Sequence, residues 1–261
     1  MKYCLQYNRE LKIANQPEEL IIKYNQNDKS LLYFLEQHKE QRIILFVEFD
    51  YDLKMLKALC DKYSNLVIQF NFYNERTIEN IVECNFPFFF GDRVSTWDKF
   101  LGLIELGVTD IYIVEDLCFE LDKVAKIAHA AGVQLRTYAN VVQSSWKDGE
   151  YLKKFFMRPE DVEIYEPYID VLEFFGKSGQ IPTYYKIYKE DKQWFGPLKE
   201  IIIGFNMDLD SRYIIPRFAE RRVSCGRKCL KGGKCRMCER IKELSHTLEE
   251  NKIIVTIDKK D

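Results

Sequence analysis

Short apolar runs alternate with amphipathic stretches along this chain of 261 residues from Glu18 onward. The apolar runs are rich in β-branched and aromatic residues, which is typical of buried strands. In the stretches between them, apolar residues recur at helical spacing. This alternation predicts repeated strand–helix units around a parallel sheet.

Eight strands are expected before residue 206, and their number favours a closed (β/α)8 TIM-like barrel over an open, doubly wound sheet. Gly107 and Gly132 are placed to end two of the helices in a left-handed conformation, and Pro159 to begin another. The predicted strands are 18–24, 42–49, 66–72, 87–92, 111–117, 134–141, 171–176 and 200–205, and the predicted helices 30–38, 52–64, 75–84, 95–107, 119–132, 158–169 and 183–194.

The chain divides at the end of the eighth predicted strand. Residues 1–206 are expected to form the barrel, including a lead-in strand at 4–7, and residues 207–261 a small cysteine-rich cap with a helix and a terminal strand at 253–257. The lead-in strand either pairs with that terminal strand or plugs one end of the barrel.

Composition and charge narrow the class of protein. The hydrophobic content of 46% is enough for a large core, and no apolar run has the roughly 18 residues of a membrane span, so we expect a cytoplasmic protein without a membrane partner. The net charge of -2 conceals a basic segment between Arg212 and Arg236, with nine basic residues against Glu220. A function that needs positive charge is therefore expected near this segment.

Four of the eight cysteines, Cys225, Cys229, Cys235 and Cys238, lie within 14 residues. Their crowding, with glycines between them, favours a shared metal site over a disulfide framework. Four thiolates suit either a [4Fe-4S] cluster or a tetrahedral zinc ion, and the spacing does not decide between them. The other four, Cys4, Cys60, Cys84 and Cys118, are scattered and are expected to pack as small apolar side chains.

Two segments resemble the collagenase-like peptidase family U-32. The stretch 155–177, which contains Arg-Pro-Glu-Asp, resembles the signature of that family, and 135–143 resembles its sixth-strand segment, with Asn140 and Gln143 as the matching polar residues. The resemblance implies a TIM-like barrel that often carries a [4Fe-4S] cluster and catalyses oxygen-independent hydroxylation of RNA bases or quinone precursors. The chain departs from the pattern where Glu173 replaces a basic residue and Lys177 an arginine.

If the barrel is real, its active site lies at the carboxyl ends of the strands. Carboxylates there could transfer protons, and arginine or lysine could bind a carboxylate or phosphate group; acidic and amide side chains at strand ends also cap the following helices. The candidate catalytic residues are Glu48, Asp92, Arg93, Glu115, Asp116, Arg136, Asn140, Glu173 and Lys177.

Three functions remain open from the sequence. The first is an iron–sulfur barrel enzyme that modifies a small molecule or RNA. The second is a barrel with structural zinc that binds nucleic acid or a partner protein. The third is a peptidase, although the chain has no HExxH or GxSxG motif.

Overall fold

The computed structural model describes residues 1–6, 17–25, 28, 30–48, 51–71, 75–142, 154–177, 179–205, 209–214, 217–226 and 236–241. Within these ranges the chain forms a curled sheet in which every strand pairing is parallel. The strands are β1 (Lys2–Gln6), β2 (Glu19–Lys23), β3 (Arg42–Val47), β4 (Leu66–Phe70), β5 (Phe88–Phe90), β6 (Arg93–Val94), β7 (Asp110–Ile113), β8 (Gln134–Tyr138) and β9 (Val171–Glu173).

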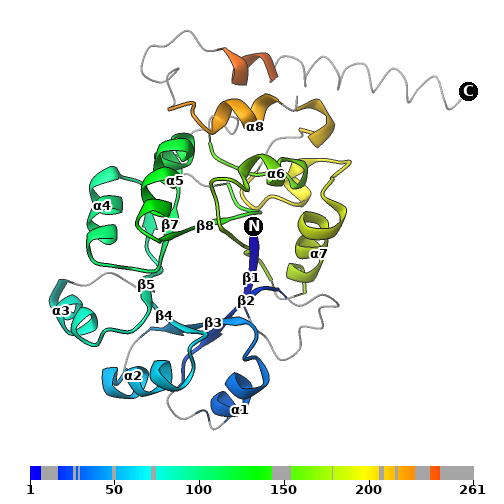
Figure 1. Cartoon of the computed structure of the whole chain (residues 1–261). Helices are drawn as coiled ribbons and strands as arrows, with labels where there is room; N and C mark the ends of the chain where they lie inside the picture. The colour runs from blue at the N-terminus through cyan, green and yellow to red at the C-terminus, as the bar shows by residue number, and fades with distance from the viewer. Residues whose placement is uncertain are drawn as a thin grey trace, which may run out of the picture.

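Helices lie outside the curve of the sheet, where α1 to α5 follow one another around the strands (Figure 1). Their bounds are α1 (Ser30–Gln37), α2 (Leu53–Lys62), α3 (Glu75–Glu83), α4 (Trp97–Glu105), α5 (Leu121–Ala130), α6 (Val162–Tyr165), α7 (Ile181–Lys186) and α8 (Arg217–Arg222). Gly107 and Gly132 both have φ of 73°, so the predicted left-handed ends of α4 and α5 are confirmed. A mixed α/β fold on a parallel sheet is thus confirmed.

The order of strands in the sheet is β5-β4-β3-β2-β1-β9-β8-β7-β6. Its two ends, β5 and β6, are consecutive in the chain and are separated by only Gly91 and Asp92. The backbone N–H of Thr109, just before β7, also donates to the carbonyl of Phe88 in β5, at 2.8 Å. The curl therefore brings its first and last strands close together.

The lead-in segment is an integral strand, which corrects the expectation that it would pair with the terminal strand or plug the barrel. β1 lies between β2 and β9 and hydrogen-bonds to both, with Cys4 level with Glu19 on one side and Glu173 on the other. Since β1 takes the position between the first and seventh predicted strands, no place remains there for a strand at 200–205. That segment follows a 3-10 helix, Leu198–Glu200, and makes a single bridge between Ile203 and Val141.

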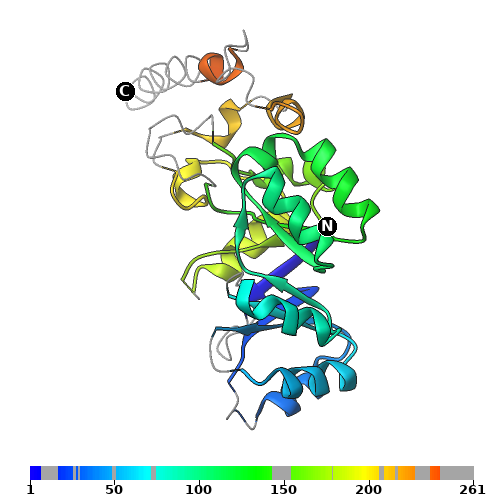
Figure 2. The ribbon, with the colours of Figure 1, turned by 90° about the vertical axis from the view of Figure 1, so that its left-hand side faces the viewer.

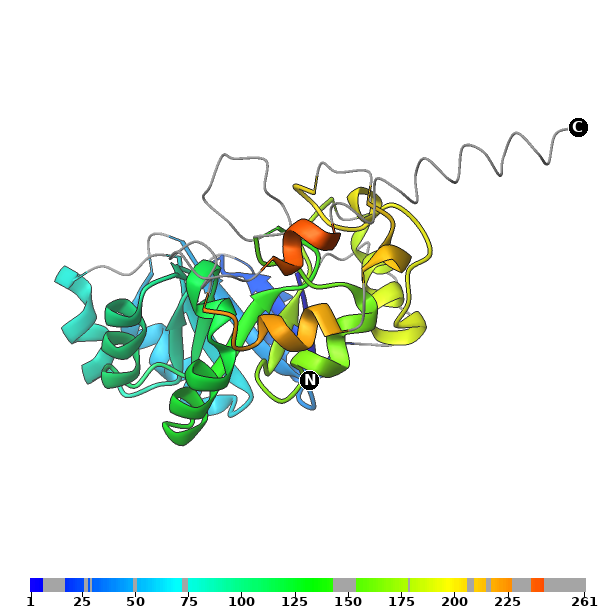
Figure 3. The ribbon, with the colours of Figure 1, turned by 90° about the horizontal axis from the view of Figure 1, so that it is seen from above.

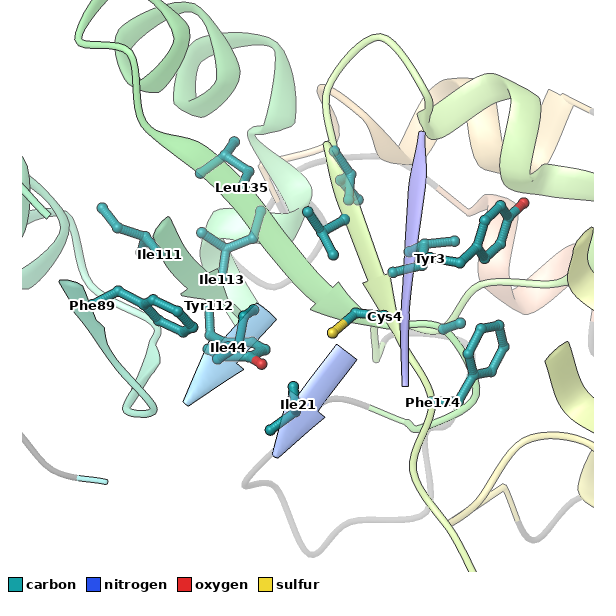
Figure 4. Packing of buried hydrophobic residues seen from close by; sticks show 14 of the residues in the cluster. Tyr3, Cys4, Ile21, Ile44, Phe89, Ile111, Tyr112, Ile113, Leu135 and Phe174 are labelled. Carbon is teal, nitrogen blue, oxygen red and sulfur yellow. The ribbon is translucent and has the colours of Figure 1, made fainter. Parts of the chain in front are cut away.

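The two faces of the sheet differ in their side chains. On the outer face Tyr3 stacks on Phe174 at 6.2 Å between ring centres, while Cys4 points into the concave side towards Ile21 and Tyr112 (Figure 4). This alternation follows from the period of two along a strand. The inner face also holds buried charged residues, which form the site described next.

Among the C-terminal residues that the structure describes, α8 and the segment 236–241 lie near each other (Figure 3). They are at the opposite end of the molecule from α1 and α2 (Figures 1 and 2). Arg158 joins the segment before α8 to the 3-10 helix Pro159–Asp161, because it is bidentate to Asp161 and donates to the carbonyls of Ser211 and Ile214. The boundary at residue 206 and the cysteine-rich cap stay predictions, and the terminal strand expected at 253–257 lies outside the described residues.

Candidate functional site

A network of buried charges occupies the concave side at the amino ends of the strands. Arg42 donates to both oxygens of Asp110, at 2.8 and 2.6 Å, and to Glu19 at 3.1 Å. Arg136 donates from Nη1 to Glu19 at 2.7 Å and to Asp110 at 2.8 Å. We call Glu19, Arg42, Asp110 and Arg136 the amino-end network. Two carboxylates against two guanidinium groups leave it neutral.

Burial alone would raise the pKa of Asp110, but the hydrogen bond from Arg42 and the charges of Arg136 and Arg42 outweigh burial and lower it to about 2. Within the described part of the chain, Nε and Nη2 of Arg136 have no hydrogen-bond partner. Its guanidinium carbon lies 5.3 Å from the ring centre of Phe89 and 5.4 Å from that of Tyr112. Arg136, a predicted site residue, is therefore held inside the sheet by the network.

Four side chains meet near the carboxyl ends of β6 to β9, and we call Arg93, Tyr112, Tyr138 and Glu173 the strand-end cluster. The Tyr112 hydroxyl donates to Oε2 of Glu173, and the Tyr112 and Tyr138 rings stack with centres 5.6 Å apart. The guanidinium carbon of Arg93 lies 5.0 Å from the centre of the Tyr138 ring. Glu173 is 5% exposed, whereas Arg93 is exposed. The cluster thus extends from a buried carboxyl group to an accessible cation.

The surroundings of Glu173 favour its protonated form. Burial raises its pKa, and the charge of Arg136 and the hydrogen bond from Tyr112 oppose that rise without cancelling it. Burial, followed by the charge of Glu173, also raises the pKa of Tyr112 and of Tyr138. A raised pKa brings a carboxyl group closer to the pH at which an enzyme works, and general acid–base catalysis is most efficient when the two are close.

Gln69 in β4 adds an unused polar group to the concave side. It is 7% exposed, and its Oε1 has no hydrogen-bond partner among the described residues. A Cβ atom on Gly91 would lie 2.9 Å from its Nε2, so the glycine leaves the space that the amide occupies. Gln69 could accept a hydrogen bond from a bound molecule.

Three of the other predicted strand-end residues lie in local contacts of their own. Glu48 forms an ion pair with Lys23 at 2.5 Å, and Asp92 lies 3.6 Å from Lys99. Asn140 exchanges two hydrogen bonds with the backbone of Phe175, at 2.7 and 2.9 Å, and so fixes the end of β9.

The remaining three predicted residues follow strands β7 and β9. Glu115 begins a 3-10 helix with φ of 52°, and Asp116 and Lys177 are exposed. The structure therefore brings Arg93 and Glu173 into one cluster, and the catalytic roles of all nine predicted residues stay predictions.

Two residues of the cluster, Tyr112 and Tyr138, were missed by sequence reasoning, as were Gln69 and the carboxylates of the amino-end network. The alternation of side chains along each strand could have revealed Asp110, Tyr112 and Tyr138. Asp110 and Tyr112 alternate with isoleucines in β7, and Arg136 and Tyr138 alternate with Leu135 and Thr137 in β8. Polar side chains repeated on one face of a buried strand indicate a polar interior.

Two of the four clustered cysteines lie in the described residues. Cys225 follows α8 and Cys238 lies in the segment 236–241; both are half-buried, and Cys229 and Cys235 lie outside the described residues. In the described part no group of three potential ligands is assembled. Both described thiols, together with Tyr165 and Asp161, act on the charge of the buried Arg222 guanidinium. A thiolate-bound metal carries negative charge, so these two residues fit such a centre.

The turn at Cys225 and Gly226 lies on the side of the sheet where β7 and β8 end. The backbone N–H of Gly226 donates to the carbonyl of Phe119, at 2.8 Å, at the end of the 3-10 helix that follows β7. Lys154, whose carbonyl accepts a hydrogen bond from Arg222, belongs to the stretch between β8 and β9. The carboxyl ends of these strands also carry the strand-end cluster.

Comparisons with known proteins do not assign a family. No family model and no curated protein matches the chain. A cube-shaped, highly porous protein cage, designed by fusing symmetric oligomeric domains, matches 90% of this chain and 75% of its own chain, at 10% identity and a TM-score of 0.39. A similarity at this level supports no argument about fold or function. Within the described ranges, no helix is long and apolar enough to span a bilayer.

Proposed function

We propose that this chain is a barrel enzyme of the U-32-like type, which modifies a small molecule or an RNA base and carries a metal centre on its four clustered cysteines. The strand-end cluster carries the proposal. It combines a buried carboxyl group of raised pKa, a tyrosine hydrogen-bonded to it, and an exposed arginine. Acid–base groups at the carboxyl ends of parallel strands are the usual catalytic arrangement of α/β barrels.

Closure of the sheet as a (β/α)8 barrel is part of the proposal. Counting β5 and β6 as one strand interrupted at Gly91 and Asp92 gives eight strands around the curl. The hydrogen bond from Thr109 to Phe88 and the pairing of β6 with β7 both support a continuous wall. Helices outside and polar side chains inside are consistent with such a barrel.

Each residue of the strand-end cluster has a separate role in the proposed proton transfer. Glu173, when protonated, gives its proton to the substrate and afterwards recovers one. Tyr112 orients the Glu173 carboxyl group by its hydrogen bond. Arg93 binds a negatively charged group of the substrate, and the ring of Tyr138 holds the guanidinium from one side.

Cys225, Cys229, Cys235 and Cys238 would hold the metal centre. A bound [4Fe-4S] cluster would supply electron transfer, whereas a bound zinc ion would stabilise the C-terminal segment. The cation of Arg222 beside Cys225 and Cys238 supports an anionic centre of either kind.

Metal analysis of protein prepared without oxygen tests the proposal. We expect brown protein with about four iron atoms and four sulfides per chain. Colourless protein with one zinc ion per chain would contradict the iron–sulfur enzyme and leave a zinc-stabilised barrel. Protein without any bound metal would refute the metal centre.

A binding assay tests the cluster separately. Tritiated or fluorescent carboxylates, phosphates and RNA oligonucleotides are offered to the wild type and to Arg93→Gln, Glu173→Gln and Glu163→Gln variants. Glu163 is a matched control, since it is exposed and paired with Lys192 at 3.0 Å. We expect Arg93→Gln alone to weaken anion binding at least tenfold, or about 1.4 kcal/mol. Equal binding by the wild type and Arg93→Gln would refute the anion site.

The zinc alternative is favoured by one observation. Gly226, next to Cys225, is anchored to Phe119, so a metal at this turn would tie the C-terminal segment to the loop after β7. In that case the barrel is a binding module for nucleic acid or a partner protein, and iron-free protein would bind RNA in a salt-dependent way.

A further inference from the structure

Arg222, at the end of α8, is a buried cation surrounded by aromatic rings. It is 2% exposed, and its guanidinium carbon lies between 4.6 and 5.4 Å from the centres of four rings. The rings are those of Phe119, Phe155, Phe156 and Phe218. Ring faces attract a cation, but they carry no negative charge to neutralise it.

The hydrogen bonds of Arg222 are to neutral groups. Nη1 donates to the carbonyl of Phe156 at 3.4 Å and Nη2 to the carbonyl of Lys154. Within the described ranges, Nε has no hydrogen-bond partner, and the carboxylate that acts on the charge of the guanidinium, Asp161, is already bound to another arginine. Arg158, by contrast, is bidentate to Asp161. An unpaired buried charge is strongly unfavourable, so Arg222 calls for an anion nearby.

Two cysteines from separate segments converge on this cation. The backbone N–H of Cys225 donates to the carbonyl of Arg222 at 3.2 Å, and its side chain packs against the core. Cys238 belongs to a second segment, which the buried side chains of Met237 and Ile241 fix to the core. Burial lowers the pKa of Arg222, and the charges of Tyr165, Cys238, Asp161 and Cys225 oppose that effect in this order.

We infer that Arg222 is the built-in countercharge of an anionic thiolate centre that includes Cys225 and Cys238. This inference rests on the proposed metal centre and adds a residue that raises the affinity of that centre for its metal. Four thiolates around a divalent zinc ion leave two negative charges, and a four-thiolate iron–sulfur cluster is also anionic. One buried guanidinium offsets part of that charge, and the aromatic rings exclude the water that would otherwise screen it.

Metal competition measures this role. Wild-type protein, Arg222→Gln, Arg222→Lys and Arg212→Gln are loaded with zinc alone and titrated with a chelator of known affinity, with thermal unfolding of each metal-free form as a record of folding. Glutamine keeps hydrogen-bond donors for the carbonyls but removes the charge. Arg212 is the matched control, because it belongs to the same basic segment, its side chain is exposed, and it already has a carboxylate partner, Asp210, at 2.7 Å.

We expect Arg222→Gln to bind zinc at least tenfold more weakly than the wild type, and Arg222→Lys and Arg212→Gln to bind within about threefold of it. If Arg222→Gln does not fold, the Arg222→Lys variant decides. Zinc binding close to that of the wild type supports the role of Arg222 as a countercharge, and a tenfold loss of zinc affinity overturns it. Phe218→Leu removes a ring but keeps the charge; a loss of affinity equal to that of Arg222→Gln would mean that packing holds the centre.

The outcomes separate the two proposals. A wild type that binds no metal refutes the metal centre itself. A wild type that binds zinc, with Arg222→Gln binding equally well, leaves the metal centre in place and overturns the role of Arg222. If the loaded metal is an iron–sulfur cluster, Arg222→Gln should also lower its reduction potential, because the cation stabilises the more negative reduced form.

Discussion

Replacement of Asp110 with asparagine tests whether the amino-end network stabilises the fold. Asp110 is 1% exposed, and its oxygens accept hydrogen bonds from both Arg42 and Arg136. The substitution keeps the size of the side chain but removes its charge. Arg42 and Arg136 would then share Glu19 as their carboxylate within the network.

The expected loss can be estimated in two ways. Removal of one partner from a buried ion pair costs about 3 to 5 kcal/mol. The pKa of Asp110, lowered from 3.8 to about 2, corresponds to about 2 kcal/mol at 1.36 kcal/mol per pH unit. We therefore expect Asp110→Asn to lower the free energy of unfolding by about 3 kcal/mol at pH 7.

The sign of the pH dependence follows from the direction of the shift. Because folding lowers the pKa of Asp110, its contribution to stability is fully present above pH 4 and is lost as the pH falls towards 2. The difference between wild type and Asp110→Asn should therefore narrow over that range.

Urea unfolding from pH 7 down to pH 2.5 measures both effects, with Asp61→Asn as the control. Asp61 pairs with Lys57 at 2.6 Å, the same distance as Asp110 with Arg42, but its side chain is 59% exposed. An exposed pair contributes at most about 1 kcal/mol. Equal losses for the two variants at pH 7, or a difference that does not narrow in acid, would refute the reasoning.

Three further predictions concern other buried groups. Tyr112→Phe should raise the pKa of Glu173 further, because it removes a hydrogen bond that lowers this pKa in the wild type. Carbon NMR titration of labelled glutamate measures the pKa, and the Glu173→Gln variant identifies the signal. An unchanged pKa would contradict the prediction. Arg158→Ala should cost about 3 kcal/mol in urea unfolding, because it leaves buried Asp161 unpaired. A loss no larger than that of Lys57→Ala, which breaks an ion pair with exposed Asp61, would count against this. In native protein, iodoacetamide should modify half-buried Cys84 before Cys4 and Cys118, which are fully buried; peptide mass mapping that shows Cys4 modified first would reverse the expected order.

The sequence predicted the elements better than their connectivity. Seven of the eight predicted strand segments contain strands, because each is a short apolar run that a parallel sheet can bury on both faces. The segment 200–205 looks just as apolar, yet it forms a turn. β1 pairs with β9 in the place that a strand at 200–205 would need. Which segment pairs with a strand depends on the whole fold, so a local apolar pattern does not reveal it.

The candidate site was predicted only in part for a related reason. Arg93 was recognised as a charged residue at a strand end, and Glu173 because it departs from the pattern of the family that the chain resembles. Tyr112 and Tyr138 count as ordinary strand formers, and only the register of β7, β8 and β9 reveals that they lie beside Glu173. Arg222 was recognised as part of a basic segment, whereas its burial among four aromatic rings depends on distant residues.

The amino-end network and the strand-end cluster are connected through the interior of the sheet. The guanidinium of Arg136 is bound to Asp110 and Glu19 and lies against the ring of Tyr112, which in turn donates to Glu173. The charge of Arg136 lowers the pKa of Glu173, while that of Glu19 raises it. Removal of a carboxylate from the network would leave Arg136 less neutralised and so lower the pKa of Glu173. Asp110→Asn should therefore change the protonation of the proposed acid as well as the stability of the fold, although the two residues lie on different strands.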